Sequence, residues 1–224
     1  MRELTELIDH FDPAWPIVSE WIATAERPVE VLPASQESCD RALLATQVTT
    51  RSPMGAIFHN SAAILIDHGW LRILGAGGHP RFQRSLPSWN EEKGNGYLLI
   101  ADDILGGFFA INGGGLGNDL RMIYFYAPDT LGWESCDIGY SDFVCWAMTA
   151  RLTDFYADYY WPGWEKEMDT INGDQALCVF PFLFTDGPHI SQRKRGIVPV
   201  EELWNLQIEI EQSLDSNTQT DFER

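Results

Sequence analysis

The adjacent carboxylates Asp102 and Asp103 are the first residues in this sequence whose types could support chemistry. A pair of carboxylates can bind a metal or share general acid–base work. Adjacent residues of a strand point to opposite faces, however, so these two side chains are not expected to converge on one atom. Aspartate is also common in turns, and two glycines follow at Gly106 and Gly107. The pattern therefore favours a hairpin turn over a catalytic pair.

A second candidate set consists of Arg51, Asp67, His68 and Asp129. These types could form an acid–base centre or a small-molecule site if the fold brings them together. Nothing in their spacing requires that they meet, and a histidine in a hairpin is usually a turn residue. The chain also contains no Gly-x-Ser-x-Gly elbow and no His-Glu-x-x-His zinc pattern. An enzyme or ligand binder that uses the Arg51, Asp67 and His68 region is therefore the alternative hypothesis.

Two further patterns lack the spacing of a cofactor or metal site. The glycine run from Asn112 to Gly117 has no Gly-Lys-Ser/Thr ending, and a strand is expected after it rather than a helix, so it is interpreted as a turn. The sequence also contains four widely spaced cysteines, Cys39, Cys136, Cys145 and Cys178. They form no Cys-x-x-Cys pair. We therefore expect reduced thiols, no metal and no cofactor.

Aromatic residues are abundant, with 12 Phe, 9 Trp and 7 Tyr. Tryptophan and tyrosine dominate the energetics of protein interfaces, so Trp133, Tyr140 and Trp161 are candidates for an exposed binding patch. The alternative is core packing, which is expected for at least half of the aromatic residues between Trp133 and Trp164. The two hypotheses differ in whether these rings are exposed.

The formal net charge of −18 restricts the partners of the chain. Nucleic-acid binding depends on Lys and Arg that neutralise phosphates, so this class of function is not expected. Anionic membrane surfaces are disfavoured for the same reason. Strong acidity maintains solubility, and it also accelerates encounter with cationic surfaces. We therefore expect that any macromolecular partner is a basic protein, and the oligomeric state stays open.

The N-terminal sequence MRELTELIDHFD carries acidic residues where a signal peptide needs an apolar run. No apolar stretch approaches the ~20 residues that span a bilayer. The sequence therefore predicts a cytoplasmic protein with no membrane segment.

A β-meander followed by a helix is predicted at the centre of the chain. Strands are expected at Tyr97–Ala101, Gly107–Ile111 and Met122–Tyr126, with a short edge strand at Leu131–Trp133. Ser141 is expected to cap a helix that begins near Asp142.

The flanking segments predict helices at both ends of the chain. Helices are expected from Asp12–Pro13, from Ser35 through Ala45, and from Val200 to Leu214. Extended segments are expected at Pro28–Pro33, Gln47–Thr50, Gly55–His59, Ala63–Asp67, Trp70–Leu74 and Ala176–Thr185. The predicted fold is a single α+β domain over residues 1–214, in which a mainly antiparallel sheet is flanked by N- and C-terminal helices. Residues 215–224 are predicted to be a disordered polar tail.

Several phrases resemble an uncharacterised bacterial family of unknown function over nearly the whole chain. They are DPAWP (12–16), VEVLP (29–33), QVTTRSPMGAI (47–57), DHGWLRILG (67–75), DDILGGFFAINGG (102–114), WPGWE (161–165) and EELWNLQ (201–207). More loosely, the order GGFFAIN, YFYAPDTLGWE and YSDF is similar to the SUKH superfamily. That superfamily includes fungal cell-wall-assembly regulators and bacterial toxin-immunity proteins. The resemblance implies a SUKH-like centre, and it supplies no catalytic residue.

The leading hypothesis from the sequence is a non-enzymatic intracellular binding protein of the immunity or regulatory type. The alternative is a small-molecule enzyme or ligand binder, and a purely structural module is third. Polar residues converging in a deep pocket would favour the enzyme. An acidic surface groove with interspersed aromatic residues would favour the protein binder.

Overall fold

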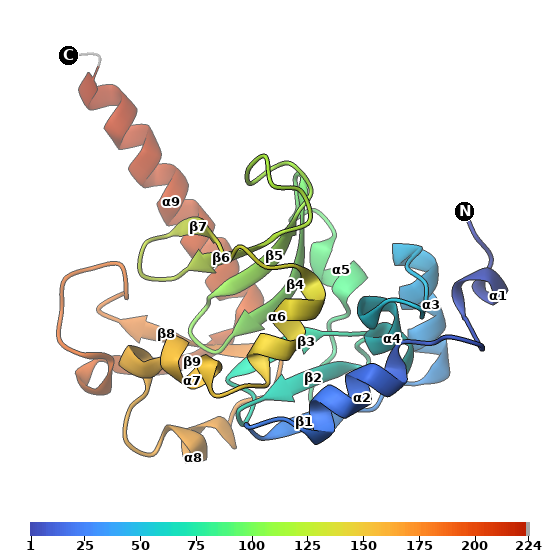
Figure 1. The fold of residues 1–224 in the computed structure, drawn as a ribbon. Helices are drawn as coiled ribbons and strands as arrows, with labels where there is room; N and C mark the ends of the chain where they lie inside the picture. Colours follow the sequence, from blue (N-terminus) through green and yellow to red (C-terminus); the bar gives the residue numbers. More distant parts are fainter. Residues whose placement is uncertain (223–224) are drawn as a thin grey trace.

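The computed structural model describes residues 1–222 of the chain, with side chains as far as Leu214. Its centre is a seven-stranded antiparallel sheet whose strand order follows the order of the chain (Figure 1). The strands are β1 (Val29–Leu32), β2 (Ala63–Ile66), β3 (Leu71–Leu74), β4 (Tyr97–Asp103), β5 (Phe108–Asn112), β6 (Ile123–Ala127) and β7 (Gly132–Ser135). Each strand pairs with its neighbour in the chain, so the sheet is a continuous meander. The predicted α+β class with a mainly antiparallel sheet is confirmed.

The turns between strands follow the local sequence. The hairpin between β2 and β3 turns at Asp67, His68 and Gly69, all of which have positive φ (53°, 61° and 86°). Gly106, with φ 86°, belongs to the turn between β4 and β5. The interpretation of Asp102 as a turn residue was wrong, because it is paired and buried within β4. Asp103 ends β4, and its carboxylate accepts hydrogen bonds from the Leu105 and Gly107 N–H groups of the predicted turn.

Two rows of directly paired residues cross all seven strands, one on each face of the sheet. The first row is Glu30, Leu65, Arg72, Asp102, Phe108, Tyr126 and Trp133. The second row is Val31, Ile64, Ile73, Ala101, Phe109, Phe125 and Glu134. Successive strand residues point to opposite faces. Trp133 and Glu134 therefore end the two rows on opposite faces of the sheet.

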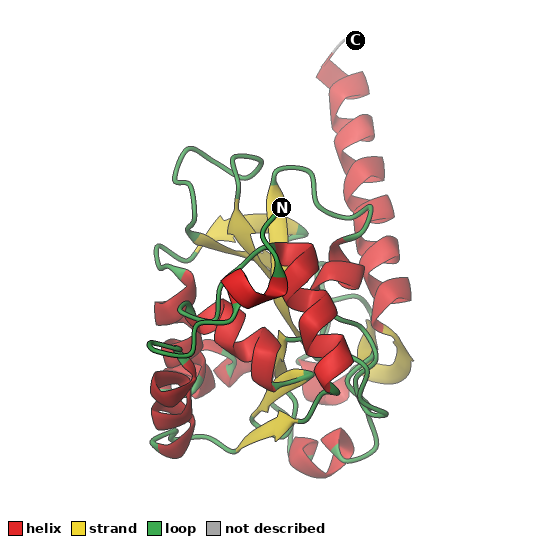
Figure 2. Cartoon of the chain, turned by 90° about the vertical axis from the view of Figure 1, so that its right-hand side faces the viewer, coloured by secondary structure: helices red, strands yellow, loops and turns green. Residues whose placement is uncertain are grey.

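Four short helices precede or interrupt the first strands. They are α1 (Leu4–Leu7), α2 (Trp15–Ala23), α3 (Gln36–Thr46) and α4 (Pro53–Asn60). Figure 2 shows them gathered in front of the sheet. The predicted strand at Gly55–His59 was wrong, because Pro53–Asn60 forms α4, and the segment predicted as a strand at Gln47–Thr50 is not a strand in the structure. The Ser52 hydroxyl accepts a hydrogen bond from the Gly55 N–H (3.1 Å), and Pro53 begins the helix, so local capping decides the outcome.

The remaining helices lie beside and after the meander. They are α5 (Leu86–Asn90), α6 (Tyr140–Ala147), α7 (Arg151–Phe155), α8 (Trp164–Met168) and α9 (Val200–Phe222), with 3-10 turns at Ala157–Tyr159 and Ile190–Gln192. A second, two-stranded sheet pairs β8 (Gln175–Phe180) with β9 (Lys194–Pro199). Within residues 1–222, no helix combines the length and the apolar character needed to cross a membrane.

Several predicted helix ends differ from the structure. The second helix begins at Trp15 rather than near Asp12, and α6 begins at Tyr140 after Gly139 rather than after Ser141. The predicted end of the last helix at Leu214 was too early, since α9 continues to Phe222. Residues 223–224 of the predicted polar tail lie outside the described residues.

Aromatic side chains pack on both faces of the central strands. On one face, the Phe108 ring lies 4.7 Å from the Trp204 ring of α9 and 6.3 Å from the Trp89 ring of α5. On the other face, the Phe109 ring lies 4.8 Å from the Phe143 ring of α6. Helices α5 and α9 therefore cover one face of β5, and α6 covers the other.

Candidate functional site

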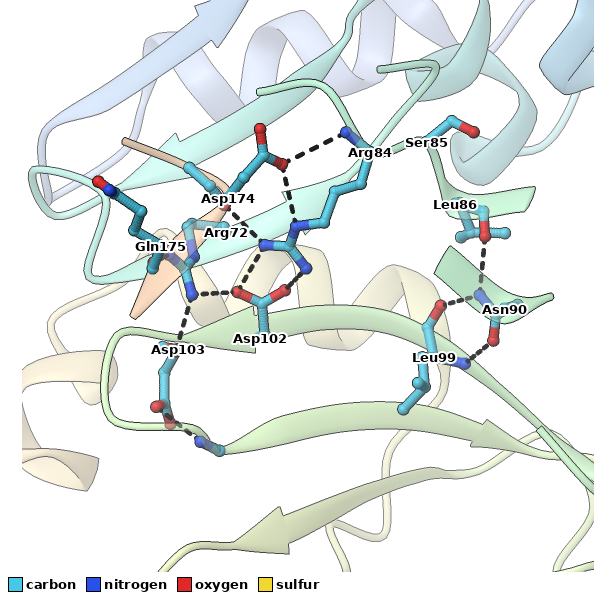
Figure 3. A network of polar contacts seen from close by, with 12 residues as sticks. Arg72, Arg84, Ser85, Leu86, Asn90, Leu99, Asp102, Asp103, Asp174 and Gln175 are labelled. Carbon is cyan, nitrogen blue, oxygen red and sulfur yellow. Dashed lines mark hydrogen bonds and ion pairs between the residues drawn. The ribbon is translucent and has the colours of Figure 1, made fainter. Parts of the chain in front are cut away.

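A buried ionic network connects the middle of the sheet to the strand that begins the second sheet (Figure 3). Arg72 of β3 and Asp102 of β4 are direct cross-strand partners, with 2.5 Å between guanidinium and carboxylate. Arg84 forms two hydrogen bonds with the same carboxylate, one of 3.0 Å, and donates to the Gly173 carbonyl at 2.8 Å. Burial lowers the pKa of Arg72, and the charge of Asp102 opposes that shift. The carboxylate of Asp102 is saturated by protein donors, which indicates a structural role.

Asp67 belongs to a second internal ion pair rather than to an open catalytic centre. Its side chain is fully buried and forms an ion pair with Arg27. The Tyr160 hydroxyl donates to the second oxygen of the Asp67 carboxylate at 2.9 Å. Both carboxylate oxygens therefore have donors, and the pair fixes the β2–β3 turn against the segment that carries Tyr160.

His68 lies exposed at the rim of a pocket of about 440 Å³, which Arg72 and Arg81 also line. Arg81 forms two hydrogen bonds with Glu30, at 2.7 and 2.9 Å, and Arg72 is paired with Asp102. Both arginines of the pocket are therefore neutralised by carboxylates of the protein. This arrangement offers little to an anionic substrate.

A groove of about 940 Å³ lies between the α5–β4 connection, β7 and α9. We name it the acidic groove. Its charged residues are Glu91, Glu92, Lys93, Glu201, Glu209 and Glu211, and its aromatic residues are Tyr97, Trp133 and Trp204. Five carboxylates against one ammonium give the groove a strong negative potential.

The aromatic floor of the acidic groove is held rigidly by the sheet. The half-buried Trp133 ring lies 5.0 Å from the Tyr97 ring and 5.3 Å from the Tyr126 ring. The Tyr126 hydroxyl donates to Glu211 of α9 at 3.0 Å. Burial, followed by the Glu211 charge, raises the pKa of Tyr126, so this hydroxyl remains a neutral donor. This hydrogen bond joins β6 to helix α9 beneath the groove.

Lys93 illustrates how the acidic groove accommodates a cation. Its ammonium lies 3.0 Å from a Glu201 carboxylate oxygen and 4.4 Å from the centre of the Trp89 ring. Carboxylate attraction and cation–π attraction therefore act on one ammonium at the wall of the groove.

The remaining candidates from the sequence are dispersed over the molecule. Arg51 is exposed and forms an ion pair with Asp12 at 3.1 Å, far along the chain from Asp129, whose carboxylate accepts from Tyr159 at 2.5 Å. Only Asp67 and His68 lie together, as chain neighbours. The four residues of the proposed acid–base set therefore do not form one site, because their partners come from different parts of the molecule.

The three aromatic candidates also differ in position. Trp133 lines the acidic groove, whereas Trp161 is 4% exposed and has the Arg195 guanidinium 4.2 Å from its ring centre. The Tyr140 hydroxyl is buried and has no hydrogen-bond partner among the described residues, and burial raises the pKa of this phenol. Of the three, Trp133 is the one that lines the acidic groove.

Sequence reasoning missed the glutamates of the acidic groove and the buried arginines. A signal for two of the glutamates was present, because Glu201 and Glu209 lie outside the apolar stripe that was recognised on this helix. Arg72 also stood out as a charge inside the apolar run WLRILG. In the part of the chain that the structure describes, no group of three or more His, Cys, Asp or Glu residues could hold a metal. The four cysteines are free.

Comparison with known proteins places the chain among relatives without an assigned activity. Residues 4–203 match a family described as protein of unknown function DUF2625. The uncharacterised protein YbfG of Escherichia coli K12 is 40% identical over 216 residues, which cover 95% of this chain and 99% of that protein. An uncharacterised protein of Haemophilus influenzae (strain ATCC 51907) is 34% identical over 224 residues, covering 97% and 94%. No solved structure matches the chain. The SUKH resemblance stays a prediction.

Proposed function

The chain belongs to the DUF2625 family, whose description names no activity, and we propose from its geometry that it is a non-enzymatic binding protein for a basic protein partner. The observation that carries the proposal is the acidic groove, in which five glutamates surround an aromatic floor. A basic segment of the partner lies in this groove. Its lysine or arginine side chains contact the carboxylates, and its apolar stems cover Trp133 and Tyr97.

The proposal includes an immunity or regulatory role in the cytoplasm. An immunity protein must associate quickly with its toxin, and complementary charge accelerates encounter between proteins. The net charge of −18 and the concentration of glutamates in one groove support this mode of association. Four free thiols support a reducing compartment.

The small-molecule alternative at the Arg51, Asp67 and His68 region receives less support. Arg51 pairs with Asp12 near the N-terminus, and Asp67 is occupied by Arg27 and Tyr160. His68 is left without either of the other two as a catalytic partner. We therefore retain the protein binder as the conclusion.

Peptide titration tests the proposal directly. Labelled nona-lysine should bind and change the Trp fluorescence, whereas labelled nona-glutamate should not. Binding should weaken steeply with salt, because the Debye length falls from about 30 Å at about 0.01 M to about 8 Å at about 0.15 M. A nona-lysine affinity that is indifferent to salt would contradict the proposal.

A matched pair of double variants separates the acidic groove from the overall charge. Glu92→Gln with Glu209→Gln removes two carboxylates from the groove, and Glu20→Gln with Glu165→Gln removes two exposed carboxylates elsewhere. Both change the net charge equally. The groove double variant should lose at least about tenfold in affinity, roughly 1.4 kcal/mol, and the control double variant much less. Equal losses in the two would mean that no particular surface is the binding site.

A further inference from the structure

Two adjoining cavities lie on the face of the sheet opposite to the acidic groove. One has a volume of about 180 Å³ and the other about 260 Å³, and both are lined by Phe125, Glu134 and Phe155. We name the two together the aromatic cleft. Glu134 directly follows Trp133 in β7, so the groove and the cleft are separated by the thickness of the sheet.

The larger cavity forms the apolar end of the aromatic cleft. Its rings are in mutual contact: Phe125 and Phe155 are 5.2 Å apart, and Trp146 and Phe155 are 5.3 Å apart between ring centres. Phe109 lies 4.7 Å from Phe125 and completes the wall on the sheet side. Phe155 remains 41% exposed, which leaves this wall accessible from solvent. An apolar group that enters here is removed from water on several sides.

The smaller cavity forms the acidic end of the aromatic cleft. It is lined by the acidic residues Asp103, Asp129 and Glu134 together with Tyr156 and Tyr159. No lysine, arginine or histidine lines either cavity within the described part of the chain.

The carboxylates at the acidic end have neutral donors as their close partners. The Tyr159 hydroxyl donates to Asp129 at 2.5 Å, and the Tyr156 hydroxyl donates to Asp103 at 2.9 Å. Neither Asp129 nor Glu134 forms an ion pair with any residue that the structure describes. Asp129 and Glu134 thus keep a negative charge that no ion pair of the described residues neutralises, whereas Asp103 also interacts with the charge of Arg72.

We propose that the aromatic cleft binds a small hydrophobic amine, with the ammonium at the acidic end and the apolar part at the aromatic end. The ammonium gains attraction from Asp129 and Glu134 and from the faces of the tyrosine and phenylalanine rings. The apolar part fills the space between Phe125, Phe155 and Trp146. An anion is repelled by the carboxylates, and a strongly hydrated metal ion gains nothing from the rings. This site does not depend on the protein partner of the acidic groove.

Phenethylammonium is the probe that tests this site. Its binding is measured by calorimetry and by the fluorescence of Trp146 and its neighbours. The neutral analogue 2-phenylethanol and the anion phenylacetate share the ring and differ in the charge of the head. The amine should bind at least about tenfold more tightly than the alcohol, and the anion should not bind measurably. Equal binding of amine and alcohol, or no binding of the amine at millimolar concentration, would overturn the proposal.

Variants locate the site and keep it distinct from the acidic groove. Glu134 is exposed, so Glu134→Gln should fold normally and weaken the amine at least about tenfold, while Glu92→Gln in the groove should leave the amine affinity unchanged. An unchanged amine affinity in Glu134→Gln would overturn the assignment. Competition between nona-lysine and the amine would indicate that the cleft binds a lysine of a protein partner, and it would overturn the proposal that its ligand is a small free amine. Amine binding without nona-lysine binding would support the cleft and remove the function proposed for the groove.

Discussion

Arg72 and Asp102 face each other across β3 and β4 as direct register partners, and their charged groups lie 2.5 Å apart with both side chains excluded from solvent. The ion pair is therefore part of the sheet rather than an addition to its surface. Arg84 adds a second guanidinium to the same carboxylate. Asp102 is thus the shared counter-charge of two buried cations, and Arg84 also forms an ion pair with Asp174 at 3.4 Å.

Replacing Asp102 should be far more damaging than replacing an exposed acid. Asp102→Asn leaves Arg72 and Arg84 buried without their shared counter-charge, and an uncompensated buried charge costs about 3–5 kcal/mol. Glu30→Gln removes the carboxylate of the exposed Glu30–Arg81 pair and should cost at most about 1 kcal/mol. Urea unfolding of both variants measures the difference. Similar losses of unfolding free energy in the two variants would mean that the buried ion pair stabilises the fold no more than the exposed pair does.

Asp103 should make folding depend on pH in an unusual direction. Burial raises the pKa of Asp103 from 3.8 to about 6, although the Gly107 and Leu105 N–H groups and the Tyr156 hydroxyl favour its charged form. The folded state therefore holds a proton that the unfolded state has lost between pH 3.8 and about 6. The contribution of this group is complete below pH 3.8 and is lost as the pH rises through about 6.

Asp103→Asn should remove that dependence, since the amide resembles the protonated acid. The gain in unfolding free energy relative to the natural chain should be larger at pH 8 than at pH 4, by up to about 3 kcal/mol. Denaturant titrations at the two pH values give the comparison. A difference that does not change with pH would show that Asp103 titrates normally.

Gly107 should tolerate no side chain, although its backbone conformation is not in the left-handed region. A Cβ at this position would lie 2.1 Å from the Asp103 carboxylate and 2.5 Å from the Phe125 ring. Gly107→Ala should therefore cost about 1–3 kcal/mol, the usual range for overpacking in a core. Gly196→Ala in β9 is the matched control, because a Cβ there meets nothing within 4 Å. Thermal unfolding of the two variants separates the destabilisation caused by close contacts of the new Cβ from the effect of replacing a glycine on the entropy of the unfolded chain.

The four thiols should react slowly in the folded protein. Burial raises the pKa of the Cys136 thiol to about 11, with smaller contributions from Asp137 and Glu134. Burial also raises the pKa of Cys39, Cys145 and Cys178. Reaction requires the thiolate. A thiol titration with an aromatic disulfide should thus be slow at neutral pH and should reach four thiols after denaturation. Fewer than four would reveal a disulfide or a modified cysteine.

The hairpins of the fold could be predicted from the sequence, because their signals are local. The predicted strands Ala63–Asp67 and Trp70–Leu74 contain β2 (Ala63–Ile66) and β3 (Leu71–Leu74) of the structure, on either side of the predicted His68–Gly69 turn. The α4 segment was predicted wrongly because the short run GAIFH does not distinguish a buried strand from a buried helix. The preceding Ser52 and Pro53 carried the helix signal.

The acidic groove and the ionic network could not be predicted, because their members are distant in the chain. Lys93 and Glu201, for example, are 108 positions apart. Charge composition predicted a preference for basic partners, and only the packing of α9 beside the α5–β4 connection places the glutamates together. The same limit applies to Asp102, whose neighbours Arg72 and Arg84 come from different elements.

The order of the strands also has a consequence for the sequence of events in folding. Every strand of the seven-stranded sheet pairs with its neighbour in the chain, and the β2–β3, β4–β5 and β6–β7 pairings close short turns at a low entropic cost, whereas helices separate β1 from β2 and β3 from β4. The two buried guanidiniums, in contrast, donate to backbone carbonyls that are distant in the sequence. Arg84 donates to Gly173, 89 positions away, and Arg72 donates to Gln175, 103 positions away. We therefore expect the meander to assemble first and the segment around Gly173 to dock last. Pulsed hydrogen exchange should protect amides of β5 before those of β8, and protection in the reverse order would contradict this sequence of events.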